Sequence, residues 1–275
     1  MSGVQKKVTP KLALRTCGGV WNVGSEEGKL LTMALREELK KQGNWLFRWR
    51  SYLPLIMIII VLLGMSYFEY PGHSEEYDDI WEIICLFISF SGVGIRFFTV
   101  GFTPEGTSGT NTRKQIADSL NTVGMYSVVR HPLYLGNFII WLGLSAFFHL
   151  WWFSLIVILI FCLYYERIMF AEEEFLREKF GEIYLQWAEK TPAFIPDIRK
   201  WCSSDMTFSF RKAVKNEYKS LFAVIVAFSV LEIIGDIFVE QKFEIDNMWL
   251  SILTIGLIIY TFVRFLKKRT KILEF

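Results

Sequence analysis

The sequence predicts an all-α fold, a polytopic membrane bundle of about six transmembrane helices. The 275 residues are 52% hydrophobic and 17% aromatic, with a mean hydropathy of +0.32, whereas a soluble domain is about 45–50% apolar. Six apolar windows approach the roughly 20 residues that a helix needs to cross the hydrocarbon core. Lysine and arginine are alternately abundant and scarce between these windows, a charge pattern typical of a multi-pass protein.

The remaining composition excludes several other classes of protein. A formal net charge of +2 leaves no overall electrostatic footprint for a nucleic-acid partner. Four scattered cysteines do not form a disulfide framework, and three unpaired histidines predict no metal site. Residues 1–21 contain no apolar run of signal-peptide length, so we expect no cleaved targeting segment.

The apolar windows and the segments before them predict the order of the helices. The windows are Tyr52–Phe68, Ile80–Val100, Leu133–His149, Trp151–Phe170, Leu221–Val239 and Met248–Phe265. Only Leu150 separates the third window from the fourth, which predicts a helical hairpin with a very short turn. Leucines at helical spacing in residues 29–41 predict a short interfacial helix before the first span.

The distribution of basic residues predicts how the bundle faces. Lysine plus arginine number ten in residues 1–52, three in 101–132, nine in 171–220 and five in 264–275, against none in 69–79 and one in 240–247. By the positive-inside rule, both termini are cytoplasmic. In a bacterium this places the protein in the inner, or plasma, membrane.

The chain enters the third window through Arg130, His131 and Pro132. Pro132 favours an extended conformation at His131 and suits the first position of a helix, because that position needs no N–H donor. Arg130 and His131 are therefore expected at a helix N-terminus, which favours an anion. Gly136 would let a ligand or another helix approach closely. Alternatively, Arg130 and His131 only anchor the span at the head groups.

A second polar group follows the fourth window. Its members are Glu166, Arg167 and the triplet Glu172–Glu174. Residues 175–187 then show the spacing of an amphipathic helix, which a Pro-rich turn at 191–196 ends. This interfacial helix is placed to cover a pocket between the two polar groups. Alternatively, the acidic triplet is a solvated helical turn outside the membrane.

These two segments resemble a known family. GMYSVVRHPLYLG (124–136) and EEEFLREKFGEIYLQWAEKTPAFIP (172–196) are similar to the isoprenylcysteine carboxyl methyltransferase and phospholipid methyltransferase family, over roughly residues 80–200. The resemblance implies a cytoplasm-facing cofactor pocket that binds S-adenosylmethionine and a methyl acceptor carried by a lipid. It also implies that residues 53–200 form the methyltransferase membrane core, with its motifs in 124–196. Residues 1–52 are then a cytoplasmic or interfacial segment, and 201–275 a C-terminal extension with two further spans.

The resemblance assigns roles to particular residues. It implies that the cofactor is contacted by Arg130, His131, Pro132, Tyr134, Leu135, Gly136 and Glu173. Glu172 and Glu173 are the implied catalytic carboxylates, and Arg167 is the candidate for orienting the acceptor. Many members have an arginine one turn before the glutamate doublet, where this chain has Ile168. Because Arg167 is one residue further back, it shares a face more nearly with Glu174 than with Glu172.

Several functions remain open at this point. The acceptor is a membrane lipid head group, through a phosphate, amine or carboxylate, or a prenylated cysteine carboxylate, and we favour the head group. The alternative enzyme is an NADPH-dependent membrane sterol or steroid reductase, whose family shares the RHPxY box but matches the glutamate run less well. A transporter or scaffold has little support, because few charges lie within the spans.

Charged residues outside the motifs give two further expectations. Arg113 and Lys114, in the polar loop 101–121, could meet a phosphate group or be solvated. Within the spans, Glu232 and Asp236 lie one turn apart and are expected to pair with Arg96, or else to line a route for lipid.

Overall fold

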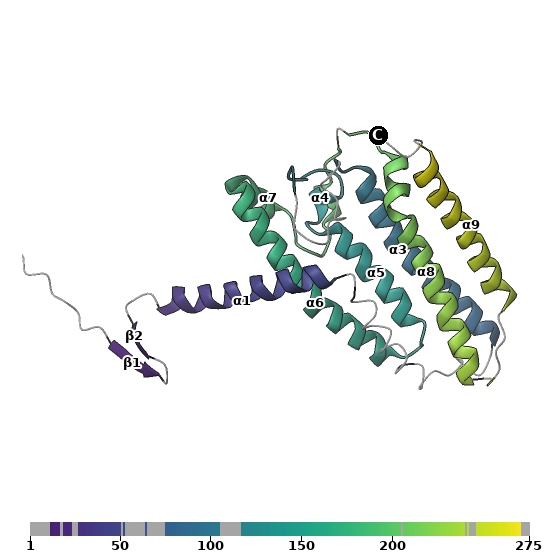
Figure 1. Cartoon of the computed structure of the whole chain (residues 1–275), viewed down its shortest axis with the longest axis horizontal. Coiled ribbons are helices and arrows are strands. Elements are labelled where there is room, and N and C mark those ends of the chain that lie inside the picture. Colours follow the sequence, from purple (N-terminus) through teal and green to yellow (C-terminus); the bar gives the residue numbers. More distant parts are fainter. Residues whose placement is uncertain are drawn as a thin grey trace, which may run out of the picture.

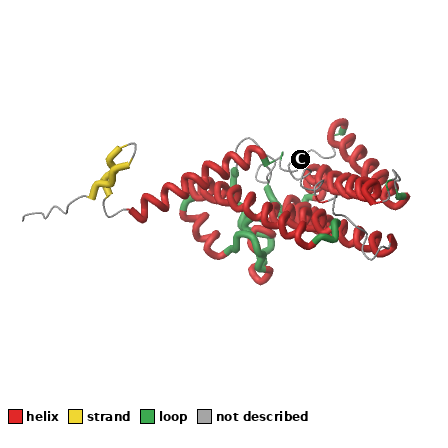
Figure 2. Tube along the Cα trace, turned by 90° about the horizontal axis from the view of Figure 1, so that it is seen from below, coloured by secondary structure: helices red, strands yellow, loops and turns green. Residues whose placement is uncertain are grey.

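The computed structural model describes residues 12–16, 19–23, 27–50, 52, 64, 75–104, 117–204, 206–239, 241 and 246–270. The elements are β1 (Leu12–Thr16), β2 (Gly19–Val23), α1 (Glu27–Trp49), α3 (Glu75–Gly101), α4 (Met125–Val128), α5 (Pro132–Ala146), α6 (Trp151–Phe180), α7 (Glu182–Lys190), the 3-10 turn η2 (Ile198–Lys200), α8 (Phe210–Val239) and α9 (Asn247–Arg269). Within these ranges the strands form one antiparallel hairpin, and the other regular elements are helices joined by loops (Figure 2). The all-α prediction is confirmed.

Four helices in the described ranges are long and apolar enough to cross a membrane. They are Asp79–Gly101, Trp151–Phe180, Phe210–Phe238 and Asn247–Arg269, and the apolar helix Pro132–Ala146 is shorter. These five match the second to sixth predicted windows. The first window, 52–68, lies outside the described residues apart from Tyr52 and Gly64. The protein is therefore an integral membrane protein.

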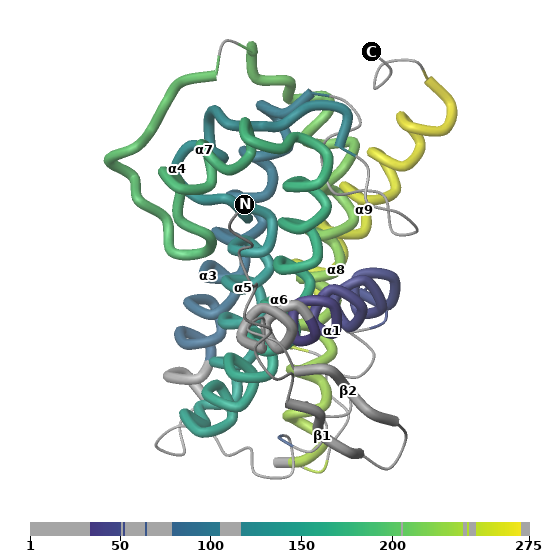
Figure 3. The backbone as a smooth tube through the Cα atoms, turned by 90° about the vertical axis from the view of Figure 1, so that its left-hand side faces the viewer, coloured from purple at the N-terminus to yellow at the C-terminus, as the bar shows by residue number. Residues whose placement is uncertain are grey.

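The long helices lie side by side, and α3 is central to their contacts. Figure 1 shows α6, α5, α3, α8 and α9 across the bundle, and α3 packs against both α5 and α8. The short helices α4 and α7 lie together at one end of the bundle (Figure 3), the end at which α9 also finishes (Figure 1). This common end is the one that the basic residues predict to be cytoplasmic, an orientation that stays a prediction.

Two glycines let α3 and α5 cross closely. A Cβ on Gly136 would lie 2.5 Å from Cγ of Arg96 and 2.8 Å from the carbonyl oxygen of Gly92. A Cβ on Gly92 would lie 2.5 Å from the carbonyl oxygen of Gly136. Small residues at such a crossing increase van der Waals contact between membrane helices, where the hydrophobic effect contributes little. Gly136 therefore serves the approach of a neighbouring helix.

The turn between α5 and α6 is longer than the sequence predicts. Helix α5 ends at Ala146, three residues before the predicted end, and Leu150 precedes α6. His149 turns the chain with a φ of 56°. Two aromatic residues of this turn, Phe147 and Phe148, are almost fully buried and anchor the turn in the core.

Arg96 does not pair with Glu232 or Asp236, so that prediction is wrong. Its Nε and Nη2 donate to the two carboxylate oxygens of Glu217 on α8, at 2.8 and 2.9 Å, and its Nη1 donates to Asn137 on α5 at 2.6 Å. Asp236 is 19 positions further along α8, which is about 28 Å at 1.5 Å per residue. An arginine side chain that contacts Glu217 therefore cannot reach Asp236, which lies towards the other end of α8.

Helix α1 is longer than the predicted segment 29–41, and it crosses α6 (Figures 1 and 3). Nε of Arg36 donates to Glu174 at 2.8 Å, and the hydroxyl of Tyr164 donates to the carbonyl of Leu46 at 3.1 Å. A Cβ on Gly43 would lie 2.1 Å from the carbonyl oxygen of Arg167. Polar contacts and backbone proximity thus fix α1 across the charged end of α6.

Candidate active site

The predicted helix start at Pro132 is confirmed, and neighbouring chain holds it in place. Pro132 opens α5, and His131 precedes it with φ −121° and ψ 60°. The backbone N–H of Arg130 donates to the carbonyl of Pro192 at 2.8 Å, and that of Asp197 donates to Val128 at 3.0 Å. The Pro-rich segment after α7 thereby fixes the peptide that carries the RHP sequence.

The amphipathic segment after the fourth window forms two helices instead of one. Helix α6 continues to Phe180, and Gly181 turns the chain into α7 with a φ of 55°, a conformation that favours glycine. The side chain of Tyr184 on α7 is buried, and the indole of Trp187 donates to the carbonyl of Tyr126 at 3.1 Å. Helix α7 therefore covers the segment around α4.

The two predicted polar groups meet at His131 and Glu173. Nε2 of His131 lies 3.0 Å from Oε1 of Glu173, and Nδ1 lies 3.7 Å from Oε2 of Glu172. Nε of Arg130 is 3.2 Å from the same Glu173 oxygen. His131 is buried, whereas Arg130 and Glu173 keep part of their surface exposed. Residues from the start of α5 and the end of α6 thus form one charged cluster.

Tyr134 extends this cluster to a residue that sequence reasoning missed. The Tyr134 hydroxyl donates to Oε1 of Glu172 at 2.7 Å. Nη1 of Arg50, directly after α1, donates to that hydroxyl at 3.4 Å and lies 3.8 Å from Glu172. The available signal was that Arg50 is the last basic residue before the first apolar window. The cluster therefore comprises Arg50, Arg130, His131, Tyr134, Glu172 and Glu173.

Other candidate residues lie elsewhere. Arg167 donates to Gln42 of α1 at 3.1 Å and to the carbonyl of Leu163 at 3.0 Å, so the structure does not bring it into the cluster. Glu174 is buried against Arg36. The backbone N–H of Leu135 donates to the carbonyl of His131 at 3.0 Å, within the first turn of α5. Arg113 and Lys114 lie outside the described residues.

Comparison with known proteins identifies the family. A family model described as phospholipid methyltransferase matches residues 85–183. The chain is 30% identical over 157 residues to the nickel-cobalt-cadmium resistance protein NccN of Alcaligenes xylosoxydans xylosoxydans, covering 56% of this chain and 68% of that protein. The chain belongs to the phospholipid methyltransferase family.

Two more relatives and the solved structures complete the comparison. The cobalt-zinc-cadmium resistance protein CzcN of Cupriavidus metallidurans is 32% identical over 157 residues, covering 56% of this chain and 67% of that protein. The protein-S-isoprenylcysteine O-methyltransferase of Schizosaccharomyces pombe is 35% identical over 79 residues, 29% of this chain and 34% of that enzyme. No solved structure matches the chain.

The phospholipid methyltransferase match divides the cluster. Residues 85–183 include Arg130, His131, Tyr134, Glu172 and Glu173, whereas Arg50 precedes the match. Family membership supports a membrane methyltransferase over the reductase that the RHPxY box left open.

In the described part of the chain, no group of three or more histidine, cysteine, aspartate or glutamate side chains could hold a metal ion.

Two buried polar atoms bear on whether S-adenosylmethionine, the cofactor that methyltransferase membership suggests, would fit the cluster. Nε of Arg130 and the hydroxyl of Tyr184 are buried and both face Glu173, Nε at 3.2 Å, but neither completes a hydrogen bond of good geometry within the described residues. Burial, followed by the negative charge of Glu173, raises the pKa of Tyr184 above its usual value, so its hydroxyl stays neutral near pH 7. The amino-acid end of S-adenosylmethionine carries a carboxylate and an ammonium group. Guanidinium groups suit the first and glutamates the second, so the residues present fit this cofactor.

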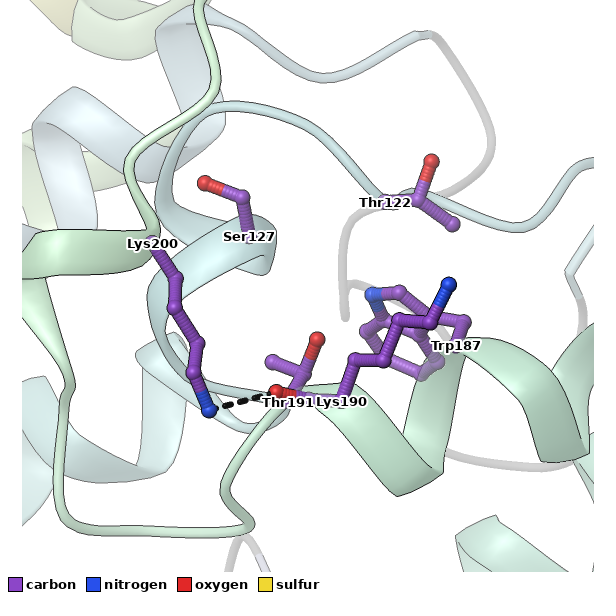
Figure 4. A pocket seen from close by; sticks show the side chains of 6 residues that line it. All are labelled: Thr122, Ser127, Trp187, Lys190, Thr191 and Lys200. Atoms are coloured by element: carbon purple, nitrogen blue, oxygen red, sulfur yellow. Dashed lines mark hydrogen bonds between the residues drawn. The ribbon is translucent and has the colours of Figure 1, made fainter.

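An open cavity of about 450 Å³ lies beside the peptide that carries Arg130. Figure 4 shows its lining residues, which are Thr122, Ser127, Trp187, Lys190, Thr191 and Lys200. Nζ of Lys200 donates to the carbonyl of Lys190 at 2.7 Å, and the Ser127 hydroxyl accepts a bond from the backbone of Cys202 at 2.9 Å. The cavity therefore lies between α4, α7 and the segment after α7, at the same end of the bundle as the charged cluster.

Proposed function

We propose that this membrane methyltransferase transfers a methyl group from S-adenosylmethionine to an acceptor carried by a membrane lipid. The observation that carries the proposal is the charged cluster that joins the start of α5 to the end of α6. It places two guanidinium groups, two carboxylates and a buried histidine at one helix N-terminus. Such a site suits a ligand that carries both signs of charge.

Particular residues are suited to particular parts of the cofactor. Arg130 suits its carboxylate, because a guanidinium forms charged hydrogen bonds with a carboxylate and the dipole of α5 favours negative charge at its start. Glu173, held by His131 at 3.0 Å, suits its ammonium group. When bound, S-adenosylmethionine supplies an electrophilic methyl group on a positively charged sulfur.

The residues of the chain act mainly by position. Methyl transfer is a direct displacement, so the protein needs only to align the acceptor with the methyl group, and no covalent nucleophile is required. Tyr134 orients Glu172 through a 2.7 Å hydrogen bond. Tyr184 and Ile168 are almost fully buried beside the cluster and limit the access of water. A low-water site favours a reaction that disperses charge.

The surroundings of the cluster support an acceptor that arrives within the bilayer. The cluster lies at the ends of α5 and α6, both of which have apolar segments. A lipid head group with a phosphate, amine or carboxylate is the favoured acceptor class, ahead of a prenylated cysteine carboxylate.

Two experiments test the proposal. Purified protein in detergent is titrated with labelled S-adenosylmethionine and, separately, with labelled NADPH; saturable binding of the first alone is expected. Lipids from cells with and without the protein are compared by mass spectrometry, and we expect one lipid class to shift by one methyl group. Binding of NADPH without S-adenosylmethionine would overturn the proposal.

A further inference from the structure

The guanidinium of Arg50 lies at the edge of the charged cluster. Its Nη1 is 3.4 Å from the Tyr134 hydroxyl and 3.8 Å from Glu172. Its side chain is 14% exposed, and the guanidinium carbon is 4.1 Å from the centre of the buried Phe47 ring. This cation–π contact and the small exposed fraction hold Arg50 facing the site.

Helix α6 contributes negative charge but no arginine to the cluster. Glu172 and Glu173 lie there, whereas Arg167 contacts Gln42 and its own helix backbone. Ile168, one turn before Glu172, is fully buried and apolar. The second cation of the cluster, besides Arg130, therefore comes from the end of α1.

The segment around Arg50 has the composition of a membrane interface. Trp45, Trp49 and Tyr52 are exposed, and their rings follow one another with centroid distances of 6.1 and 5.3 Å. Tryptophan and tyrosine concentrate at the level of the lipid head groups, since their rings combine apolar and polar parts. Arg50 lies between this aromatic row and the charged cluster, so it occupies the side from which a head group would arrive.

We infer that Arg50 binds the anionic group of the lipid acceptor and selects a phosphate or carboxylate over an amine. The inference rests on the proposed function. A guanidinium presents a planar fork of donors that matches both anions. With such an acceptor, one of its oxygens forms a bond to the methyl carbon while the carbon–sulfur bond breaks. The electron pair of that bond stays on sulfur, and no proton has to be removed.

Packing of α1 on α6 determines where Arg50 lies, so a loss of ligand binding in an Arg50 variant has to be distinguished from a loss of this packing. Arg36 provides the matched control. Arg36 is on the same helix and also pairs with a glutamate of α6, but its partner is Glu174, outside the cluster. Arg36→Gln removes an arginine and an ion pair between the same two helices, whereas Arg50→Gln removes the cation at the site. A difference between the two variants thus separates ligand binding from docking.

The test uses the full-length protein in detergent, with lipid probes detected by native mass spectrometry. The probes are phosphatidic acid for phosphate, oleic acid for carboxylate, and neutral phosphatidylcholine and an alkylamine as comparisons. The wild type should retain an anionic probe in preference to the other two. Arg50→Gln should weaken that retention by about tenfold or more, as loss of a charged hydrogen-bonding group predicts. Arg36→Gln should retain the anionic probe as the wild type does, and Arg50→Lys should retain it better than Arg50→Gln does.

Binding of S-adenosylmethionine by the same variants decides between the remaining outcomes. An unchanged affinity in Arg50→Gln supports a role toward the acceptor alone. Equal loss of both ligands, equal retention of the anionic probe by Arg50→Gln, or a wild-type preference for the amine would overturn the inference. If the wild type binds no S-adenosylmethionine yet retains the anionic probe through Arg50, the proposed function fails and anion binding by Arg50 stands.

Discussion

Nε2 of His131 lies 3.0 Å from Oε1 of Glu173, although 42 positions separate the two residues in the chain. His131 immediately precedes α5, and Glu173 lies near the end of α6. The contact therefore joins the two ends of a helical hairpin on the side away from its turn. This pair, a buried imidazole against a carboxylate, lies at the centre of the candidate site.

Replacing His131 or Glu173 by alanine should weaken the binding of S-adenosylmethionine by about tenfold or more, since a hydrogen bond to a charged group is worth about 1.5–3 kcal/mol. Calorimetric titration of the protein in detergent measures the affinity, and thermal unfolding checks that the variants are folded. Glu166→Ala is the control, because Glu166 is on the same helix and its side chain is 74% exposed. Wild-type affinity in both site variants would remove the pair from the cofactor site.

Gly92→Ala should destabilise the protein, whereas Gly94→Ala should not. A Cβ at Gly92 would lie 2.5 Å from the carbonyl oxygen of Gly136, and one at Gly94 would have nothing within 4 Å. Forcing extra volume into such a contact costs about 1–3 kcal/mol. Both residues are on α3, so helix propensity affects the two variants alike. Their melting temperatures in detergent provide the comparison, and equal values would contradict the close crossing of α3 and α5.

Glu217→Ala should lower stability strongly, because it leaves Arg96 without its carboxylate partner. Removing one member of a buried ion pair costs about 3–5 kcal/mol. Lys219→Ala, at an exposed position of the same helix, serves as the reference. A thermal shift assay should show a large decrease in melting temperature for the first variant and little change for the second. A small effect of Glu217→Ala would contradict the pairing of α3 with α8.

Tyr184→Phe should be tolerated, and Tyr184→Ala should not. The buried hydroxyl faces Glu173 without a hydrogen bond of good geometry, so its removal costs little stability, while the ring packs edge-on against Trp187 at 5.8 Å. Replacing a buried aromatic ring by alanine costs about 3–5 kcal/mol. Unfolding by heat and binding of S-adenosylmethionine should both be measured. If Tyr184→Phe weakens binding as much as His131→Ala does, Tyr184 is a ligand-binding residue and not only a packing residue.

The five apolar helices that the structure describes and the start of α5 were predictable because they depend on local chemistry. Long apolar runs define helices that cross a bilayer, and a proline suits the first position of a helix because that position needs no N–H donor. The partner of Arg96 was not predictable in this way. Its choice among Glu217, Glu232 and Asp236 depends on how far α8 is shifted along α3, which the sequence pattern does not specify.

Arg50 shows the same limit within the candidate site. It lies 84 positions from Tyr134, to which it donates a hydrogen bond, and outside the segment that matches the family. Helical periodicity relates residues on one helix, but it gives no information about a different helix that crosses that one. Arg167 was a candidate through the resemblance to the family, although its spacing put it nearer the face of Glu174, and the structure places it against Gln42 of α1.

The sequence by itself determined that the protein is a helical membrane protein and that its charged motifs flank one helical hairpin, because composition and spacing along the chain are enough for both. Only the tertiary structure decided which side chains meet. At about 100° per residue, the neighbours Glu173 and Glu174 point in different directions, and the surrounding helices determine that Glu173 meets His131 while Glu174 meets Arg36. The physical reason is that a side chain finds its partner over a few ångströms in space, and the distances between helices arise only when the bundle packs.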